Sequence, residues 1–447
     1  MLKKMFMYVK SCFVLIVMSF VLCSCSNNND LPKGAKYFEP IWFENLSEYA
    51  TGNYNTISEF KDGLAIATFA NMGEEWKVSG KSIAVINKNG EIILGPFHED
   101  VDIKIIDKNN FCIWSDESTK IVDANNNTKA VFDASLGWGI SVSYTEKLFN
   151  KDGIASCVKA ASGRLVGYGL VNQSGETVVP CKYKANFSDA EDEYIVLIKD
   201  EERKNADVYH SDGSFSHSIS LDYMIEDYKN GLLEIVGAEQ TNSGYYQAYG
   251  YGFTDIYGNV VVEPAHDRMC SVISKDCIII SNRDNNGCQI LNSNGEIIKS
   301  LNINFYNQHD ATEMVNDIFM LDTGFKSYLI SSKGDILKEY SDSRSSKYCG
   351  DGIFSLTFGS YNDEHVKLID SKTGDFIGEQ YGDRTEICFN DGYAFVEDPE
   401  YNSSFVIDKK GNKCLEGYEI SGNVTDRVVR IHNDTTAGII CLPPIED

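Results

Sequence analysis

Basic residues are scarce in this chain of 447 residues. It carries 40 Lys and Arg against 66 Asp and Glu, which gives a formal net charge of −26 at pH 7. Nucleic acids and anionic lipid head groups both require a basic surface, so this acidic body is unsuited to bind either of them directly. The composition therefore predicts no nucleic-acid partner, and contact with a membrane only through an anchor.

Motifs of the common enzyme classes are also absent. The chain has no GxSxG elbow, no P-loop, no HExxH and no GxGxxG between a strand and a helix. Because the chain is rich in Asp and Glu, carboxylate pairs of the kind that hydrolyse glycosides could be assembled in any ring. Their presence is therefore no evidence of a glycosidase. We therefore predict a non-enzymatic protein with no catalytic residue, cofactor or metal site.

Helical periodicity and linkers are missing too. No window holds a 3.6-residue apolar period over three turns, and β-branched and aromatic residues dominate the apolar runs. No stretch rich in Pro, Gly or Ser and no block of like charge divides the body. The chain is thus expected to be all-β and a single continuous array.

The N-terminus carries a targeting segment. Lys3 and Lys4 precede a nearly unbroken apolar run over residues 12–22, which is too short for a bilayer-spanning helix and typical of a signal peptide. The predicted signal, residues 1–24, contains three of the basic residues and no acid, so removing it lowers the formal charge from −26 to about −29. The mature protein is expected to be exported.

The end of this signal resembles the lipobox of bacterial lipoproteins. Leu22 stands three residues before Cys25 and the small Ser24 stands directly before it, whereas Cys23 follows the bulky Leu22. The resemblance implies that Cys25 becomes the lipidated N-terminus and that residues 25–37 form a tether. Because no Asp follows Cys25, the sorting signal is similar to that of outer-membrane lipoproteins, so we expect the outer membrane or cell surface.

Ten cysteines remain in the mature chain. An exported protein can pair them, but disulfide frameworks belong mainly to small domains without a sufficient core. Most of these cysteines lie inside apolar strand-like runs, where a thiol behaves as a small hydrophobe. We favour buried thiols and leave pairing open. They are Cys112, Cys157, Cys181, Cys270, Cys277, Cys288, Cys349, Cys388, Cys414 and Cys441.

A hairpin unit recurs along the chain, and residues 167–183 show it best. An apolar run ends at Asn172, a polar turn closes on Gly175, and a β-branched run leads to Pro180. Residues 251–264 repeat the pattern. The Asn or Asp before most of the turns can accept bonds from the turn's own backbone amides, while Gly supplies a left-handed residue. The turns fall at Gly90, near Asn126, and at Gly175, Gly213, Gly258, Gly295, Gly334, Gly374 and Gly411.

The turn spacing averages about 40 residues, and five of the hairpins follow a further strand that begins with Asp-Gly or Asn-Gly. At these residues the chain resembles the WG-repeat family, in which a Trp-Gly pair opens the strand before a D-x-x-G turn. Tyr168 and Tyr251 occupy the Trp position, which implies aromatic rings packed between sheets. The resemblance covers roughly residues 58–418. It implies an exported repeat surface that binds partners, and it names no reaction.

Sheets of constant length must stack on their neighbours to bury their faces, either radially as propeller blades or linearly as a solenoid. We expect residues 38–447 to form one domain of about nine units, arranged as a propeller-like ring, with an open curved stack as the alternative. Nine turns and a further hairpin over residues 428–442 would give a closed ring of about nine or ten blades, which is above the usual range of about four to eight.

One lengthened unit, residues 237–250, is rich in tyrosine. Tyr combines a large stacking face with a hydroxyl, which suits recognition, so Tyr245, Tyr246 and Tyr249 are candidate ligand-binding residues. Packing of these rings on the next unit is an equal alternative. His210 and His217 flank one turn, and acids cluster near residues 189–193 and 200–202; we interpret both groups as solvated loops because neither has metal-site spacing.

Two function classes remain. The favoured one is a lipid-anchored, non-enzymatic binding or scaffold protein that presents a rigid β surface to a protein or glycan. The alternative is a hydrolase or lyase that acts on polysaccharide at the centre of a ring.

Overall fold

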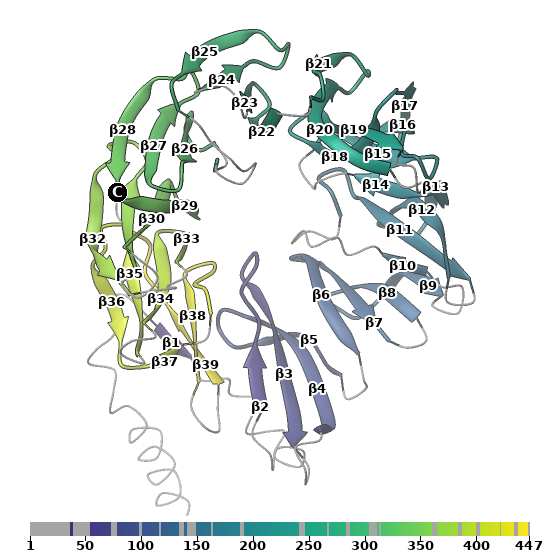
Figure 1. The fold of residues 1–447 in the computed structure, drawn as a ribbon. Coiled ribbons are helices and arrows are strands. Elements are labelled where there is room, and N and C mark those ends of the chain that lie inside the picture. The colour runs from purple at the N-terminus through teal and green to yellow at the C-terminus, as the bar shows by residue number, and fades with distance from the viewer. Residues whose placement is uncertain are drawn as a thin grey trace, which may run out of the picture.

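The computed structural model describes residues 36–38, 54–72, 78–97, 101–115, 118–133, 138–140, 149–161, 164–187, 192–240, 246–265, 268–282, 287–303, 311–312, 314–359, 364–382, 387–398, 403–420, 422–432 and 437–445. Their regular structure is entirely β, and they contain no helix long and apolar enough to cross a membrane. Ten antiparallel sheets stand around a common centre (Figure 1). The predicted all-β, propeller-like fold is confirmed.

The first five blades follow one another along the chain. Blade 1 is β2 (Tyr54–Ile57), β3 (Leu64–Met72), β4 (Val78–Asn87) and β5 (Ile92–Phe97). Blade 2 is β6 (Asp102–Asp107), β7 (Asn110–Trp114), β8 (Ser118–Asp123) and β9 (Thr128–Asp133). Blade 3 is β10 (Trp138–Ile140), β11 (Ile154–Ala161), β12 (Arg164–Asn172) and β13 (Thr177–Tyr183). Blade 4 is β14 (Ala185–Phe187), β15 (Tyr194–Ile198), β16 (Asn205–His210) and β17 (Phe215–Ser220). Blade 5 is β18 (Met224–Lys229), β19 (Leu232–Gln240), β20 (Tyr246–Asp255) and β21 (Val260–Val262).

The other five complete the ring. Blade 6 is β22 (Arg268–Ser274), β23 (Cys277–Asn282), β24 (Cys288–Leu291) and β25 (Ile297–Leu301). Blade 7 is β26 (Ile318–Asp322), β27 (Lys326–Ser331) and β28 (Ile336–Ser341). Blade 8 is β29 (Ser343–Gly350), β30 (Ile353–Phe358), β31 (His365–Asp370) and β32 (Phe376–Tyr381). Blade 9 is β33 (Cys388–Asn390), β34 (Tyr393–Asp398), β35 (Ser403–Asp408) and β36 (Lys413–Glu416). Blade 10 is β37 (Glu419–Ile420), β38 (Val428–His432), β39 (Ala437–Cys441) and β1 (Lys36–Phe38).

Strands run outward through each blade in chain order, so that β25, β28, β32 and β36 lie on the outside of the ring (Figure 1). Blade 10 differs, because its outer strand is the N-terminal β1, which pairs antiparallel with β39. This blade therefore contains no D-x-x-G turn before its outer strand. Ten blades are present where nine turns occur in the sequence.

The core is divided among the blade interfaces. Ten hydrophobic clusters of buried residues occur, and each joins two neighbouring blades. One of them joins Ile57 and Phe60 of blade 1 to Val428 and Ile439 of blade 10. An open stack would leave two terminal faces uncovered. The open alternative is wrong, and the ring is closed.

The outer hairpin turns have the predicted chemistry. Asn172 Oδ1 accepts hydrogen bonds from the amides of Ser174 at 3.0 Å and Glu176 at 2.9 Å, and Gly175 has a φ of 80°. Asp123 makes the same pair of bonds with Asn125 and Asn127. The side-chain and backbone bonds from Asn127 hold the pKa of Asp123 below its ordinary value. These turns are specified by local sequence.

The turn glycines have a second role that the sequence did not reveal. A Cβ built on Gly295, in the turn of blade 6, would lie 2.5 Å from the carbonyl oxygen of Val261 in blade 5. One built on Gly213 of blade 4 would lie 2.6 Å from Val178 Cγ1 of blade 3. These two turns thus rest on the outer strand of the preceding blade, where no side chain fits.

Two tyrosines pack at the interface of blades 3 and 4. Tyr168 is half-buried, whereas Tyr183, its partner across β12 and β13, is only 1% exposed. β13 bulges over Gly169, where a Cβ would lie 2.4 Å from the Val179 carbonyl oxygen. Tyr168 packs against the hydrophobic cluster between blades 3 and 4, as expected for the Trp position, and Tyr183 on the bulged strand is the more deeply buried ring of that interface.

Candidate functional site

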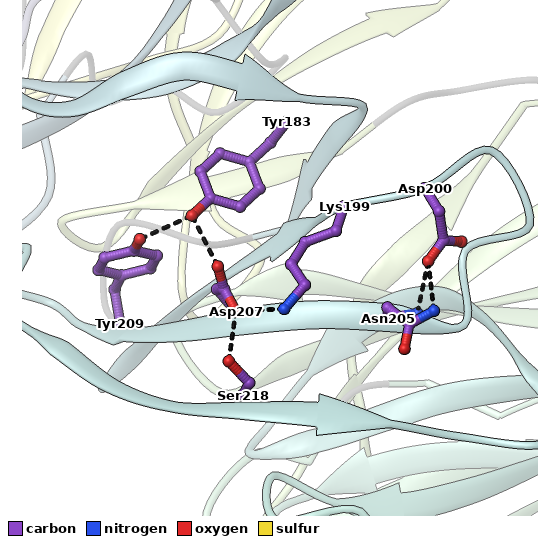
Figure 2. Close-up of polar contacts among 7 residues, drawn as sticks. All are labelled: Tyr183, Lys199, Asp200, Asn205, Asp207, Tyr209 and Ser218. Atoms are coloured by element: carbon purple, nitrogen blue, oxygen red, sulfur yellow. Dashed lines mark hydrogen bonds and ion pairs between the residues drawn. The ribbon is translucent and has the colours of Figure 1, made fainter.

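A polar network joins the outer strands of blades 3 and 4 (Figure 2). The carboxylate of Asp207 on β16 accepts bonds from Tyr183 Oη at 2.8 Å, Lys199 Nζ at 2.8 Å and Ser218 Oγ at 2.6 Å. The hydroxyls of Tyr183 and Tyr209 lie 2.8 Å apart. Because the only proton of Tyr183 goes to Asp207, Tyr209 is the donor between the two tyrosines.

The charges of this network are fixed by its bonds. Burial opposes ionisation of Asp207, but the bonds from Lys199, Ser218 and Tyr183 outweigh it and hold its pKa below the ordinary value. Burial, with the bonds to Tyr209 and Asp207, raises the pKa of Tyr183. An ionised carboxylate surrounded by donors has no reason to take up a proton near neutral pH. This network stabilises the blade interface and is unsuited to acid–base chemistry.

An exposed aromatic surface lies on the outer part of blade 8. We call it the aromatic platform; it consists of Phe358, His365, Lys367 and Phe376, with Tyr340 of blade 7 beside it. The rings of Phe358 and His365 stack with centroids 5.7 Å apart, and Phe358 meets Phe376 edge to face at 6.1 Å. Phe376 is 50% exposed.

A cation lies over this platform. Lys367 Nζ is 5.4 Å from the centroid of Phe358 and 5.3 Å from that of Phe376. Tyr340 supports the platform. Its side chain is 4% exposed, its hydroxyl donates a hydrogen bond to the Gly374 carbonyl at 2.7 Å, and its ring contacts Phe376. The platform therefore presents aromatic rings in fixed positions beside an ammonium group.

Sequence reasoning missed the platform. Its exposed member, Phe376, is the second residue after the turn glycine, at the position of Ile297 in blade 6 and Ile336 in blade 7. All three are roughly half exposed, with values of 50%, 57% and 47%. The same position carries an exposed Phe215 in blade 4, so an aromatic residue there does not by itself mark the platform in the sequence.

The tyrosine-rich unit forms an extended hairpin of β19 and β20. Tyr245 lies outside the described residues, and of Tyr246 only the backbone, at the start of β20, is described. Tyr249 is half-buried, and a Cβ built on Gly237 would lie 2.3 Å from its ring. Tyr249 thus packs on the glycine of the neighbouring strand.

The two histidines flanking Gly213 have separate partners. His210 lies beside the ring of Tyr194, with centroids 5.3 Å apart. His217 stacks on Tyr257 at 4.9 Å, and its Nε2 lies 2.9 Å from the Ile256 carbonyl oxygen. Across the described part of the chain, no group of three His, Cys, Asp or Glu side chains could hold a metal ion.

The acidic clusters are partly described. Asp200 accepts bonds from the amides of Lys204 and Asn205 and from the Asn205 side chain (Figure 2), so it caps its own turn. Glu201 pairs with Lys184 at 2.7 Å. Residues 188–191 lie outside the described part.

One carboxyl group, that of Glu234, has a raised pKa, in contrast to the lowered pKa of Asp207. Burial, followed by the charges of Asp227 and Glu226, raises the pKa of Glu234 to about 6. Glu234 lies on β19 and is paired in register with Asp227 on the innermost strand β18. A carboxyl that takes up a proton near neutral pH is the kind of group that serves as a general acid.

The fold defines the class of this protein, a ten-bladed β-propeller. No family model and no curated protein match its sequence. Among similar solved structures, the crystal structure of the eukaryotic initiation factor has a TM-score of 0.48 at 8% identity, and the alignment covers 86% of this chain and 100% of that one. BamB from Moraxella catarrhalis gives 0.29 at 10%, covering 71% and 94%. Apo AztD from Citrobacter koseri gives 0.32 at 11%, covering 72% and 95%.

Proposed function

We propose that the chain is an exported, lipid-anchored, non-enzymatic protein of the outer membrane or cell surface, which binds a protein or glycan on the surface of its propeller. The anchor is Cys25, within a sequence that resembles a lipobox. The body itself carries a strong negative charge, so only the anchor holds it at a membrane. The resemblance to WG-repeat proteins is consistent with this role and remains part of the proposal.

The aromatic platform is the observation that carries the binding role. Phe376 keeps half of its surface exposed although its ring contacts Phe358 and Tyr340, and Lys367 supplies a charged donor. An exposed aromatic ring costs hydrophobic free energy, which a ligand would recover by covering it. Flat ring faces beside a donor suit both the apolar face of a sugar and an aromatic or aliphatic protein side chain. The tyrosine-rich hairpin, with Tyr245, Tyr246 and Tyr249, is a second proposed contact.

Binding can be tested with residues 31–447 on a glycan array and against extracts of surface proteins. Phe376→Ala should lower the binding of a captured glycan or protein at least about tenfold, since a central aromatic contact contributes about 1.4 kcal/mol or more. Ile297→Ala is the matched control, because it removes an exposed apolar side chain at the equivalent position in blade 6. Equal binding by wild type and Phe376→Ala would place the ligand elsewhere.

Glu234 gives the enzymatic alternative a specific candidate. A polysaccharide hydrolase or lyase would use its carboxyl as the acid and Asp227 or Glu226 as the second carboxylate. Release of reducing ends from acidic and neutral polysaccharides, lost in Glu234→Gln and kept in Glu416→Gln, would replace the binding proposal with this one. No release by the wild-type protein is the result expected for a binding protein.

A further inference from the structure

Two thiols meet on one face of blade 3. Cys157 lies on β11 and Cys181 on β13, 24 residues apart, and their sulfur atoms are 3.2 Å from each other. The strand β12 lies between β11 and β13 in the sheet order. Cysteines separated by an intervening strand are ordinarily too far apart to touch. Their contact therefore needs a local cause.

Gly169 is that cause. It is paired in register with Cys157, and it has no side chain to separate the neighbouring strands on this face. β13 bulges here, since Leu170 pairs with Val179 while Tyr168 pairs with Tyr183. A Cβ built on Gly169 would lie 2.8 Å from the Cys181 backbone nitrogen, so Cys181 sits directly over the glycine. The bulge brings its thiol to that of Cys157.

We propose that Cys157 and Cys181 are a disulfide-forming pair, oxidised in the mature exported protein by a disulfide-bearing oxidant such as a thiol–disulfide oxidoreductase or a small-molecule disulfide. The chemistry rests on the geometry alone; only its occurrence in the cell rests on the proposed export. Exported proteins meet an oxidising environment in which such pairs persist.

The two sulfurs differ in access, which sets the order of steps. Cys181 is half-buried and Cys157 is 1% exposed. The Cys181 thiolate attacks the oxidant RSSR, forming a Cys181–SR mixed disulfide and releasing RS⁻. The Cys157 thiolate then attacks the Cys181 sulfur, the new S–S bond forms, and the second RS⁻ leaves. Overall, two protein thiols lose two protons and two electrons, and RSSR becomes two RSH.

Two other buried thiols of the ring serve as controls. Cys112 and Cys277 lie in blades 2 and 6 and are as buried as Cys157, and the thiol pKa is raised in all three, so the contact with a second sulfur is what sets Cys157 apart. They are therefore matched controls for burial without a partner sulfur. Neither should react with a disulfide oxidant while the propeller is folded.

The test uses the full chain purified in detergent, treated with oxidised glutathione or with dithiothreitol, then denatured in a thiol-alkylating reagent and digested with trypsin. Cleavage after Lys159 and Arg164 separates the two cysteines into peptides 152–159 and 165–182. The oxidised sample should show these peptides linked, with loss of two alkylated sites, while Cys112 and Cys277 stay alkylated. Full alkylation of Cys157 and Cys181 after oxidation would overturn the proposal.

A stability measurement gives an independent readout. The closed loop restricts the unfolded chain, so the oxidised protein should melt a few degrees above the reduced one. The difference should vanish in Cys157→Ala/Cys181→Ala and persist in Cys112→Ala. A linked peptide that forms only after the protein is unfolded, with no shift in melting temperature, would also overturn the proposal.

Discussion

Asp426 in blade 10 accepts a hydrogen bond from the backbone amide of Gly63 in blade 1, across 363 residues of sequence. The same joint contains the bond from the Phe60 amide to Thr425 Oγ1 at 2.8 Å and the contact of Lys88 with Asp426 at 3.9 Å. An equivalent bond runs from the Gly392 amide of blade 9 to Asp351 of blade 8. The last interface of the ring thus uses the same polar contact as an interior one.

The closing bond should contribute measurably to stability. Asp426→Ala removes the acceptor of the Gly63 amide and should lower the free energy of unfolding by about 1–3 kcal/mol. Asp391→Ala is the control, because Asp391 has nearly the same φ, 51° against 53°, and its side chain makes no hydrogen bond within the described part of the chain. Urea unfolding curves of the two variants measure the difference. Equal losses would mean that only backbone strain is involved.

The turn glycines should differ according to what lies beside them. Gly295 and Gly324 both have a φ of 79°, but a Cβ on Gly295 would lie 2.5 Å from the Val261 carbonyl, whereas one on Gly324 would meet nothing within 4 Å. Alanine at either site is strained by the left-handed backbone conformation. Only Gly295→Ala also places a Cβ against the neighbouring blade. We expect Gly295→Ala to cost about 1–3 kcal/mol more in urea unfolding. Similar costs would show that blades do not constrain this turn.

The polar network of blades 3 and 4 gives a third prediction. Tyr183→Phe keeps the buried ring but leaves Asp207 without one donor and Tyr209 without its acceptor, so it should destabilise the protein by about 1–2 kcal/mol. Tyr168→Phe should change stability by less than about 0.5 kcal/mol, because its hydroxyl makes no hydrogen bond among the described residues. Thermal melts distinguish the two variants. A larger effect at Tyr168 would contradict the assignment of Tyr183 as the hydrogen-bonded tyrosine of this interface.

Local chemistry explains how much of this fold the sequence could predict. Asn172 and Gly175 determine their turn by bonds within five residues, so the turns and the strands between them could be read from sequence. The hairpin of the tenth blade, residues 428–442, could be read as well, but its outer strand could not, because pairing of residues 36–38 with 439–441 has no local signal. Exposure of Phe376 also depends on the neighbouring blades, since the same strand pattern fits a buried or an exposed ring. For that reason the candidate platform was visible only in the structure.

Stability should vary with pH through Glu234. Its pKa is raised from 4.5 to about 6 in the folded protein, so the folded state binds the proton more tightly. The stabilising contribution is therefore complete below about pH 4.5 and is lost as pH rises through about 6. Between about pH 5 and about pH 8 this group should cost about 1 kcal/mol after allowance for solvent screening. Glu234→Gln should remove that part of the pH dependence, and the exposed control Glu416→Gln should keep it; an unchanged profile in Glu234→Gln would contradict the assignment.

Lipidation of Cys25 is what places the propeller at a membrane surface in the proposed function. The direct measurement is incorporation of labelled palmitate into the full chain expressed in a bacterium, followed by membrane fractionation. Wild type and Cys23→Ala should both carry label and sediment with the outer membrane, because the small Ser24 precedes Cys25 in both. Cys25→Ala should carry no label and remain unprocessed or soluble. Label and processing that persist in Cys25→Ala, or that disappear in Cys23→Ala, would contradict the anchor and with it the proposed place of action.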